Sequence, residues 1–99
     1  MTRPTRMMHS LKTWNDPFQA IMDGLKRFEF RKDDREFRVG DSLRLREWNP
    51  DTKEYSGREI RARVTYVLRE DFGLQPGFVV MSIRREFASL NGVIQKFDD

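Results

Sequence analysis

Residues 42–68, SLRLREWNPDTKEYSGREIRARVTYVL, contain two alternating segments separated by turn-forming residues. Apolar and charged side chains alternate in Ser42 to Trp48 and again in Arg58 to Leu68, and a period of two places successive side chains on opposite faces of a strand. Residues 49–52 and 56–57, NPDT and SG, favour a reverse turn. The stretch therefore predicts a long antiparallel hairpin. Its expected inward side chains are Leu43, Leu45, Ile60, Ala62, Val64 and Tyr66, and its outward ones Arg44, Arg46, Arg61, Arg63 and Thr65.

A short strand and a helix are predicted before this hairpin. The strand covers His9 to Lys12 and the helix covers Pro17 to Asp23. Asp16 can cap the helix, proline suits the first helical position, and Gly24 supplies the left-handed residue that ends it. Apolar residues inside the helix recur at helical spacing and are assigned to the core. They are Phe18, Ile21 and Met22.

Two further segments complete the predicted sheet. From Leu25 onward the period is two, which indicates a half-buried strand with Phe28 and Phe30 on one face, opposite Arg27, Glu29 and Arg31. Phe78 to Ile83 is a dense apolar run typical of a central strand. Beyond it, Phe87 and Leu90 allow a short C-terminal helix, and the acidic end is expected to fray.

These elements predict an α+β fold that is mostly β, with five or six strands and one N-terminal helix. A flat sheet this small would leave its edges unprotected, so we expect a strongly curved sheet that closes as a barrel. The chain has 99 residues, which is enough for one modest core and one domain.

Composition narrows the classes of function. The sequence has no cysteine, which excludes thiol chemistry and cysteine-bound metals and fits a cytoplasmic location. We find no stretch of membrane-spanning length and expect no membrane role. The net charge is only +3, but arginine outnumbers lysine, and its planar guanidinium suits phosphate groups and base edges. A solvated surface matched by nearly as many acids explains the same composition equally well.

Three runs of residues carry a family resemblance: 9–48, 57–68 and 77–83. Their most specific parts are Leu11-Lys12-Thr13-Trp14, Gly24-x-Lys26-x-x-Glu29-x-Arg31 and Val39-Gly40-Asp41. Together they resemble domain of unknown function 3850, a family similar to the ASCH (activating signal cointegrator homology) domains of the PUA-like superfamily. The resemblance implies a PUA-like barrel over 9–83 with a helix beside a cleft and a role in RNA binding. Residues 1–8 would then be a flexible basic arm and 84–99 a C-terminal extension.

The candidate site is the Lys26, Glu29, Arg31 signature. Gly24 ends the helix, so Lys26 lies where a helix end meets a strand, and such junctions form clefts. We expect the three side chains to converge on one hollow, with the two cations on phosphate and Glu29 on a base edge. The alternative is a surface charge ladder, each pair of which contributes roughly 0.2 to 1 kcal/mol.

Other residues extend this site. Lys12 and Trp14 follow the first predicted strand, and Trp14 offers a face for a base or else belongs to the core. Arg46 and Trp48 lie at the end of the first hairpin strand. They too are assigned either to ligand binding or to packing. The lone histidine, His9, is assigned a structural role, and no metal, cofactor or catalytic residue is predicted.

Three functions therefore compete. The first is a binding module for nucleic acid, RNA foremost, or for a nucleotide. The second is a small amidohydrolase acting on a modified nucleoside such as an acylated cytidine, since similar ASCH proteins have this activity. They place a threonine three positions after the signature lysine, where this chain has Glu29, which argues against hydrolysis. The third is a phage-type accessory factor that binds a host protein. The sequence leaves the oligomeric state open.

Overall fold

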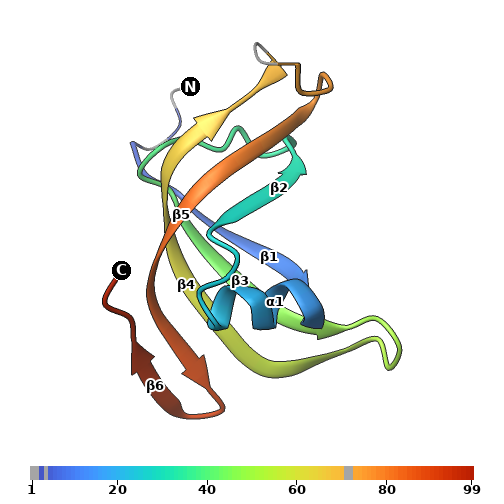
Figure 1. The fold of residues 1–99 in the computed structure, drawn as a ribbon, viewed down its shortest axis with the longest axis vertical. Coiled ribbons are helices and arrows are strands. Elements are labelled where there is room, and N and C mark those ends of the chain that lie inside the picture. Colours follow the sequence, from blue (N-terminus) through green and yellow to red (C-terminus); the bar gives the residue numbers. More distant parts are fainter. Residues whose placement is uncertain (1–2, 4, 71–72) are drawn as a thin grey trace.

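In the computed structural model, which describes residues 3, 5–70 and 73–99, one curled sheet wraps around a short helix (Figure 1). The strand order is β1-β3-β4-β5-β2, and β6 pairs with β5. β1 runs parallel to β3, and the other ladders are antiparallel. The elements are β1 (Met8–Trp14), α1 (Asn15–Met22), β2 (Phe28–Lys32), β3 (Ser42–Asn49), β4 (Glu54–Leu68), β5 (Phe78–Leu90) and β6 (Val93–Lys96).

The β3–β4 hairpin forms as predicted. Leu43, Leu45, Ile60, Ala62 and Val64 all point into the core and are buried. Tyr66, expected to follow them inward, instead lies on the outer face with 58% of its surface exposed. The β4–β5 register shifts between Val64 and Tyr66, and such an irregularity breaks the alternation of faces that the prediction assumed.

The helix begins earlier than predicted, at Asn15 rather than Pro17, so Asp16 lies in its first turn and is not its cap. Its end is as expected. Gly24 has a φ of +76°, and the amides of Gly24 and Leu25 donate to the carbonyls of Ile21 and Ala20. Phe18 and Ile21 are fully buried against the sheet, as their spacing predicted.

β2 alternates as predicted, but its charged side is the buried one. Glu29 is only 3% exposed, whereas Phe28 and Phe30 are 46% and 53% exposed. A period of two gives two faces without saying which of them meets the core. Here Glu29 faces the interior of the curl, where Lys26 and Arg31 pair with it.

The C-terminal helix that Phe87 and Leu90 allowed is absent, because β5 continues through both residues. Asn91 and Gly92 have φ values of +53° and +97° and turn the chain into β6. Positive φ at two central residues is the geometry of a tight hairpin turn, and Asn-Gly favours it. The expected fraying of the acidic end is also wrong, since the Asp99 carboxylate lies 2.7 Å from Arg85.

The predicted barrel is only half formed. β1 and β2 are the two ends of the strand order, and no ladder joins them in the part of the chain that the structure describes. Guanidinium groups bridge the gap instead: Arg31 donates to the Lys12 carbonyl and Arg35 to the Ser10 carbonyl, each at 2.7 Å. We refer to this gap between β1 and β2 as the open side.

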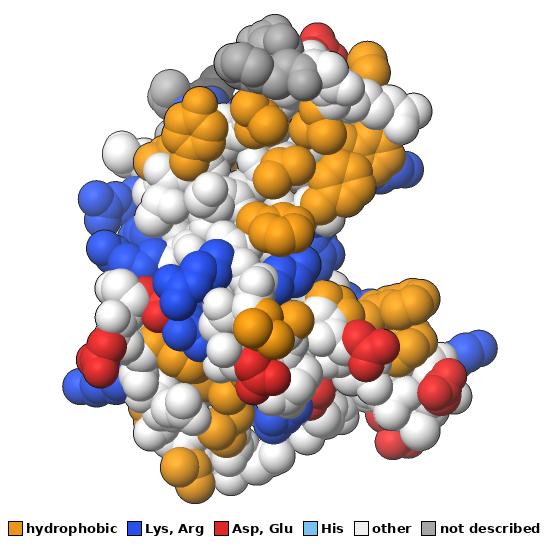
Figure 2. Space-filling model, in the orientation of Figure 1, with side chains coloured by type: hydrophobic (Ala, Val, Ile, Leu, Met, Phe, Trp, Pro, Cys, Tyr) orange, Lys and Arg blue, Asp and Glu red, His pale blue; other side chains and the backbone are white. Residues whose placement is uncertain are grey.

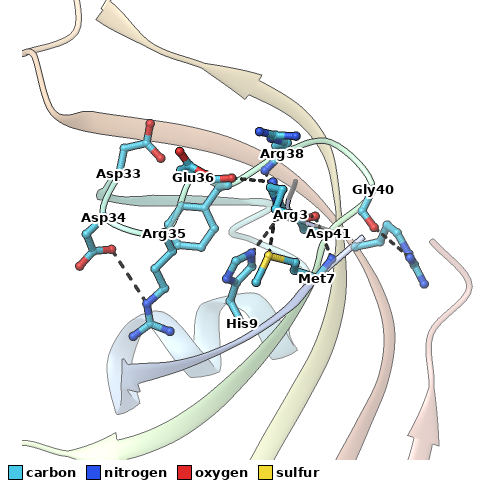
Figure 3. A network of polar contacts seen from close by, with 12 residues as sticks. Arg3, Met7, His9, Asp33, Asp34, Arg35, Glu36, Arg38, Gly40 and Asp41 are labelled. Carbon is cyan, nitrogen blue, oxygen red and sulfur yellow. Dashed lines mark hydrogen bonds and ion pairs between the residues drawn. The ribbon is translucent and has the colours of Figure 1, made fainter. Parts of the chain in front are cut away.

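A buried carboxylate holds the predicted Val39-Gly40-Asp41 turn in place (Figure 3). Asp41 has no exposed surface and accepts hydrogen bonds from Arg3 at 2.7 Å and from His9 at 2.9 Å. The Arg38 amide also donates to it, at 3.0 Å. The buried contact of His9 with Asp41 is consistent with the structural role predicted for this histidine. Arg3 belongs to the predicted arm 1–8, of which residues 1, 2 and 4 lie outside the described part.

Candidate functional site

A hollow with a volume of about 370 Å³ opens between the end of β1, the start of α1 and the open edge of β2. In Figure 2 the molecule is notched on this side, with hydrophobic side chains on both rims and Lys or Arg side chains in between. The hollow exists because the sheet does not close there. Five of the seven predicted binding residues line it: Lys12, Trp14, Lys26, Glu29 and Arg31.

Glu29 is the centre of this group. Its Oε1 accepts a 3.0 Å hydrogen bond from Lys26 Nζ, and its Oε2 accepts a 2.9 Å hydrogen bond from Arg31 Nε. The carboxylate is almost fully buried, while the two cations keep about a fifth of their surface exposed (22% and 23%). Each carboxylate oxygen is thus engaged, so Glu29 holds the two cations in place, and this contact competes with the base-edge role that the sequence suggested.

Arg31 is fixed by more than its ion pair. Its Nη2 donates to the Lys12 carbonyl at 2.7 Å and to the Thr13 hydroxyl at 3.3 Å. The planar guanidinium makes these contacts at once with both β1 and Glu29. One face of the hollow is therefore preorganised before any ligand arrives.

The aromatic side of the hollow comes from β1. Trp14 is 55% exposed and lines the hollow, so it belongs to the wall and not to the core. Its register partner in β3 is Trp48, at a ring-centroid distance of 6.4 Å. Lys12 Nζ lies 4.2 Å from the Trp48 ring centroid, a cation–π contact that holds the lysine over the strand pair.

Trp48 and Arg46 do not line the hollow. Trp48 supports its wall through Lys12 and Trp14, as described above. Arg46 lies over the Tyr55 ring at 4.0 Å and 3.7 Å from Glu59, next to the hollow along β3. Two of the seven predicted residues are therefore neighbours of the hollow and not parts of it.

The four outward arginines of the hairpin, which could form a basic patch, are interleaved with acids; they are Arg44, Arg46, Arg61 and Arg63. Glu59 pairs with Arg44 at 2.6 Å, and Glu86 lies 3.3 Å from Arg63. Arg61 packs toward the Phe87 ring, at 5.5 Å from its centroid. These contacts cancel much of the positive field on the hairpin, and the four arginines do not add up to a continuous cationic surface.

Sequence reasoning missed four residues that line the hollow: Thr13, Pro17, Phe30 and Lys32. Thr13, Phe30 and Lys32 are each adjacent to a predicted site residue, whereas Pro17 was assigned only to the start of the helix. No local signal separates them from core or surface, because β1 and β2 meet only through the curl of the whole sheet.

Metal binding has no support in the described ranges, where no group of three or more His, Asp or Glu side chains could hold an ion. In each of the two adjacent acid pairs, Asp33-Asp34 and Asp98-Asp99, one carboxylate lies close to an arginine. Asp33 lies 2.6 Å from Arg69, and Asp99 lies 2.7 Å from Arg85. No helix in the described residues is long and apolar enough to cross a bilayer.

The fold and the hollow together define a small, mostly β domain whose curled sheet leaves a cationic hollow at its open side. The family described as domain of unknown function DUF3850 matches residues 8–83, and the chain belongs to this family. A curated relative, the uncharacterized 12.9 kDa protein in the GpA 3′ region of Escherichia phage P2, is 40% identical over 60 residues. That match covers 61% of this chain and 53% of the relative, so the chain spans about half of the relative's length.

Proposed function

We propose that the hollow binds one nucleotide of an RNA chain, and that the half-barrel is an ASCH-like variant of the PUA-like fold. The single observation that carries the proposal is the Lys26–Glu29–Arg31 group, in which a buried carboxylate holds two partly exposed cations at the wall of the hollow. The family resemblance supports the choice of RNA.

Charge favours a phosphate ligand. The residues that line the hollow include Lys12, Lys26, Arg31 and Lys32, against the single carboxylate of Glu29. Because Lys26 and Arg31 are already held, little side-chain entropy is lost when an anion binds them. Nε and Nη2 of Arg31 are engaged, but its Nη1 makes no hydrogen bond among the described residues and can still donate to a phosphate oxygen.

Shape favours a base beside that phosphate. Trp14 presents an exposed ring at the wall, and stacking of one base on such a ring contributes roughly 1 to 3 kcal/mol. The volume of about 370 Å³ lies within the range of small-ligand sites. A nucleotide has both the flat ring and the anion that these two walls would bind.

Binding is preferred here over hydrolysis of an acylated nucleoside. The similar amidohydrolases have a threonine where Glu29 stands, and Glu29 is engaged with two cations. Thr13, whose hydroxyl lies at the hollow, donates to the Leu11 carbonyl and accepts from Arg31. Neither partner is a base that would take its proton.

The test is a titration of the purified protein with single-stranded RNA, duplex DNA and free nucleosides at two salt concentrations. We expect RNA binding that weakens with salt, since each phosphate neutralised releases counterions. Lys26→Ala should weaken RNA binding by about tenfold. It should also reduce the slope of log affinity against log salt concentration by about one, the contribution of one phosphate contact. Lys96→Ala, which removes an exposed lysine of β6, is the matched control.

Several outcomes would count against the proposal. The absence of RNA binding at low salt would overturn it, as would equal affinities for the wild type, Lys26→Ala and Lys96→Ala. Release of carboxylate from N-acylated cytidine by the wild type, lost in Lys26→Ala, would support the hydrolase. Thermal melts of each variant verify that it folds.

A further inference from the structure

We propose that the outer face of β4, β5 and β2 is a stacking platform for the nucleotides that flank the one in the hollow. The ligand is then an extended single strand of several nucleotides, and neither a mononucleotide nor a duplex. This inference rests on the proposed function and names its substrate class. We call this surface the aromatic face; it consists of Phe28, Phe30, Tyr66, Leu68, Phe78 and Val80.

Strand register places these six side chains on one surface. Ser82 of β5 pairs with Phe28 on one side and with Tyr66 on the other. In the next row, Val80 pairs with Phe30 and with Leu68. Phe78 continues the same face of β5, since alternate residues of a strand share a face. Figure 2 shows hydrophobic side chains gathered over this part of the sheet.

The aromatic face is not covered by any described part of the chain. Phe28, Phe30 and Tyr66 are each about half exposed, and all three are among the large apolar side chains that the fold leaves at the surface. Phe30 and Phe78 stack at 5.4 Å with an interplanar angle of 12°, so the two rings support each other. A contiguous exposed apolar patch of this kind is more often a binding site than an ordinary part of the surface.

The charges around the aromatic face favour an anionic partner. Lys26 Nζ lies 4.9 Å from the Phe28 ring centroid. Lys32 is the register partner of Phe78, and Arg63 and Arg84 pair with each other just beyond the Tyr66 row. Lys26 pairs with Glu29 and Arg63 with Glu86, while Lys32 and Arg84 have no ion pair among the described residues. Aromatic rings interleaved with cations match bases and phosphates, whereas a protein interface core is depleted of charge.

Ring spacing selects a single strand over a duplex. Phe28 and Phe30 are alternate residues of one strand, so they stand about 6.6 Å apart along it. Consecutive bases stacked in a duplex strand are about 3.4 Å apart. Only a strand that is stretched and unpaired can place successive bases on these rings.

The aromatic face is continuous with the hollow. Phe30 and Lys32 of β2 belong to the lining of the hollow, and Lys26 pairs with Glu29 in it while covering Phe28. A strand whose one nucleotide lies in the hollow would therefore reach the rings without crossing an acidic region. The path runs over the edge of β2.

The experiment measures the affinity of end-labelled oligouridylates of two, four and eight nucleotides, and of an eight-base-pair RNA duplex. We expect wild-type affinity to rise by about tenfold per additional stacked base over the first few nucleotides, and the duplex to bind no better than the dinucleotide. Tyr66→Ser should weaken eight-nucleotide binding by about tenfold and leave dinucleotide binding unchanged. Tyr66→Phe, which keeps the ring, should restore it.

Val93→Ser removes an exposed apolar side chain from β6 and serves as the matched control, which should bind every probe like the wild type. Equal affinity of the wild type for two and eight nucleotides, with Tyr66→Ser unchanged, would overturn the platform and leave the hollow's function standing. No binding of any RNA would overturn both. Self-association of the wild type that Tyr66→Ser abolishes would identify a protein interface and also overturn the platform.

Discussion

The Arg31 guanidinium of β2 donates a 2.7 Å hydrogen bond to the Lys12 carbonyl of β1, across the side of the sheet that no ladder closes. The same guanidinium pairs with Glu29 at 2.9 Å. One side chain thus ties together the two edges of the half-barrel and the wall of the hollow. The stability of the open side and the geometry of the site depend on the same residue.

Arg31→Ala should destabilise the fold as well as the site. It leaves the buried Glu29 with one partner and the Lys12 carbonyl with none in the described contacts. We expect the free energy of unfolding to fall by about 2 kcal/mol, because a buried carboxylate loses half of its pairing. For a domain of this size that lowers Tm by about 8 to 16 °C.

A thermal melt of Arg31→Lys separates the contribution of the charge of Arg31 from that of its hydrogen-bond geometry. Lysine keeps the charge but cannot reach Glu29, Thr13 and the Lys12 carbonyl together, so we expect a loss between those of the wild type and Arg31→Ala. Arg38→Ala, at an exposed position, should melt like the wild type. A wild-type Tm for Arg31→Ala would show that the open side needs no bridge.

Arg85 should be as important for the helix as Arg31 is for the sheet edge. Its Nη1 donates to the Ile21 and Met22 carbonyls at the end of α1, and its Nη2 pairs with Asp99 at 2.7 Å. Arg85→Ala removes the donor to the Met22 carbonyl, whereas the Ile21 carbonyl keeps the Gly24 amide, and an unsatisfied carbonyl costs about 1 to 3 kcal/mol. Urea denaturation should show a lower midpoint with an unchanged m-value. Arg84→Ala, at the neighbouring exposed position, is the control.

The Arg85 contact also predicts a pH dependence. The hydrogen bond from Arg85 lowers the pKa of Asp99 from 3.8 to about 2. A folded-state pKa below the unfolded one gives stability that is complete above pH 3.8 and is lost as the pH falls toward 2. Asp99→Asn should therefore match the wild type more closely at pH 2 than at pH 7. A difference that grows on acidification would contradict the assignment.

Asp41 predicts a second acid transition. Burial raises its pKa, but hydrogen bonds from His9, Arg3 and the Met7 and Arg38 amides outweigh burial and lower the pKa below 3.8. Its contribution is therefore present at neutral pH and disappears as the pH falls below that value. Asp41→Asn should lower the free energy of unfolding by about 2 to 4 kcal/mol at pH 7, since Arg3 and His9 lose a buried partner.

Urea midpoints measured from pH 7 to pH 2 test this assignment. The wild-type and Asp41→Asn curves should converge at the acid end. Asp34→Asn is the control, because that side chain is 66% exposed and its pair with Arg35 is 4.0 Å long. Parallel wild-type and Asp41→Asn curves down to pH 2 would show that the carboxylate is not what titrates.

Tryptophan fluorescence reports on the hollow without a label. Trp14 lines it and Trp48 does not, although their rings are 6.4 Å apart. If an oligouridylate enters the hollow, its base should quench the emission of Trp14 on stacking. Trp48→Phe should keep most of the change on titration and Trp14→Phe should lose it. The reverse pattern would place the ligand outside the hollow.

Local pattern determined most of the elements. Alternation in 42–68 predicted the β3–β4 hairpin and its buried leucines, and Gly24 predicted where the helix ends. These features rest on period and on turn chemistry, which neighbouring residues decide. The candidate residues Lys26, Glu29 and Arg31 could also be identified from the sequence, because they lie within a stretch of six residues.

The errors share one origin. Tyr66 lies outside because the register slips in β4, and Glu29 lies inside because β2 presents that face to the curl. Phe87 and Leu90 continue a strand because β4 and β6 pair with it on both sides. In each case a distant strand decided what the local pattern left open.

The sequence by itself therefore determined the mostly β class, the hairpin, the helix end and a group of charged residues near it. Only the tertiary structure decided that the sheet stays open between β1 and β2, that a hollow forms there, and that Trp14 and Lys12 join Lys26 and Arg31 around it. The physical reason is that faces and turns follow from a few adjacent residues, whereas curvature and register depend on the packing of every strand against the others.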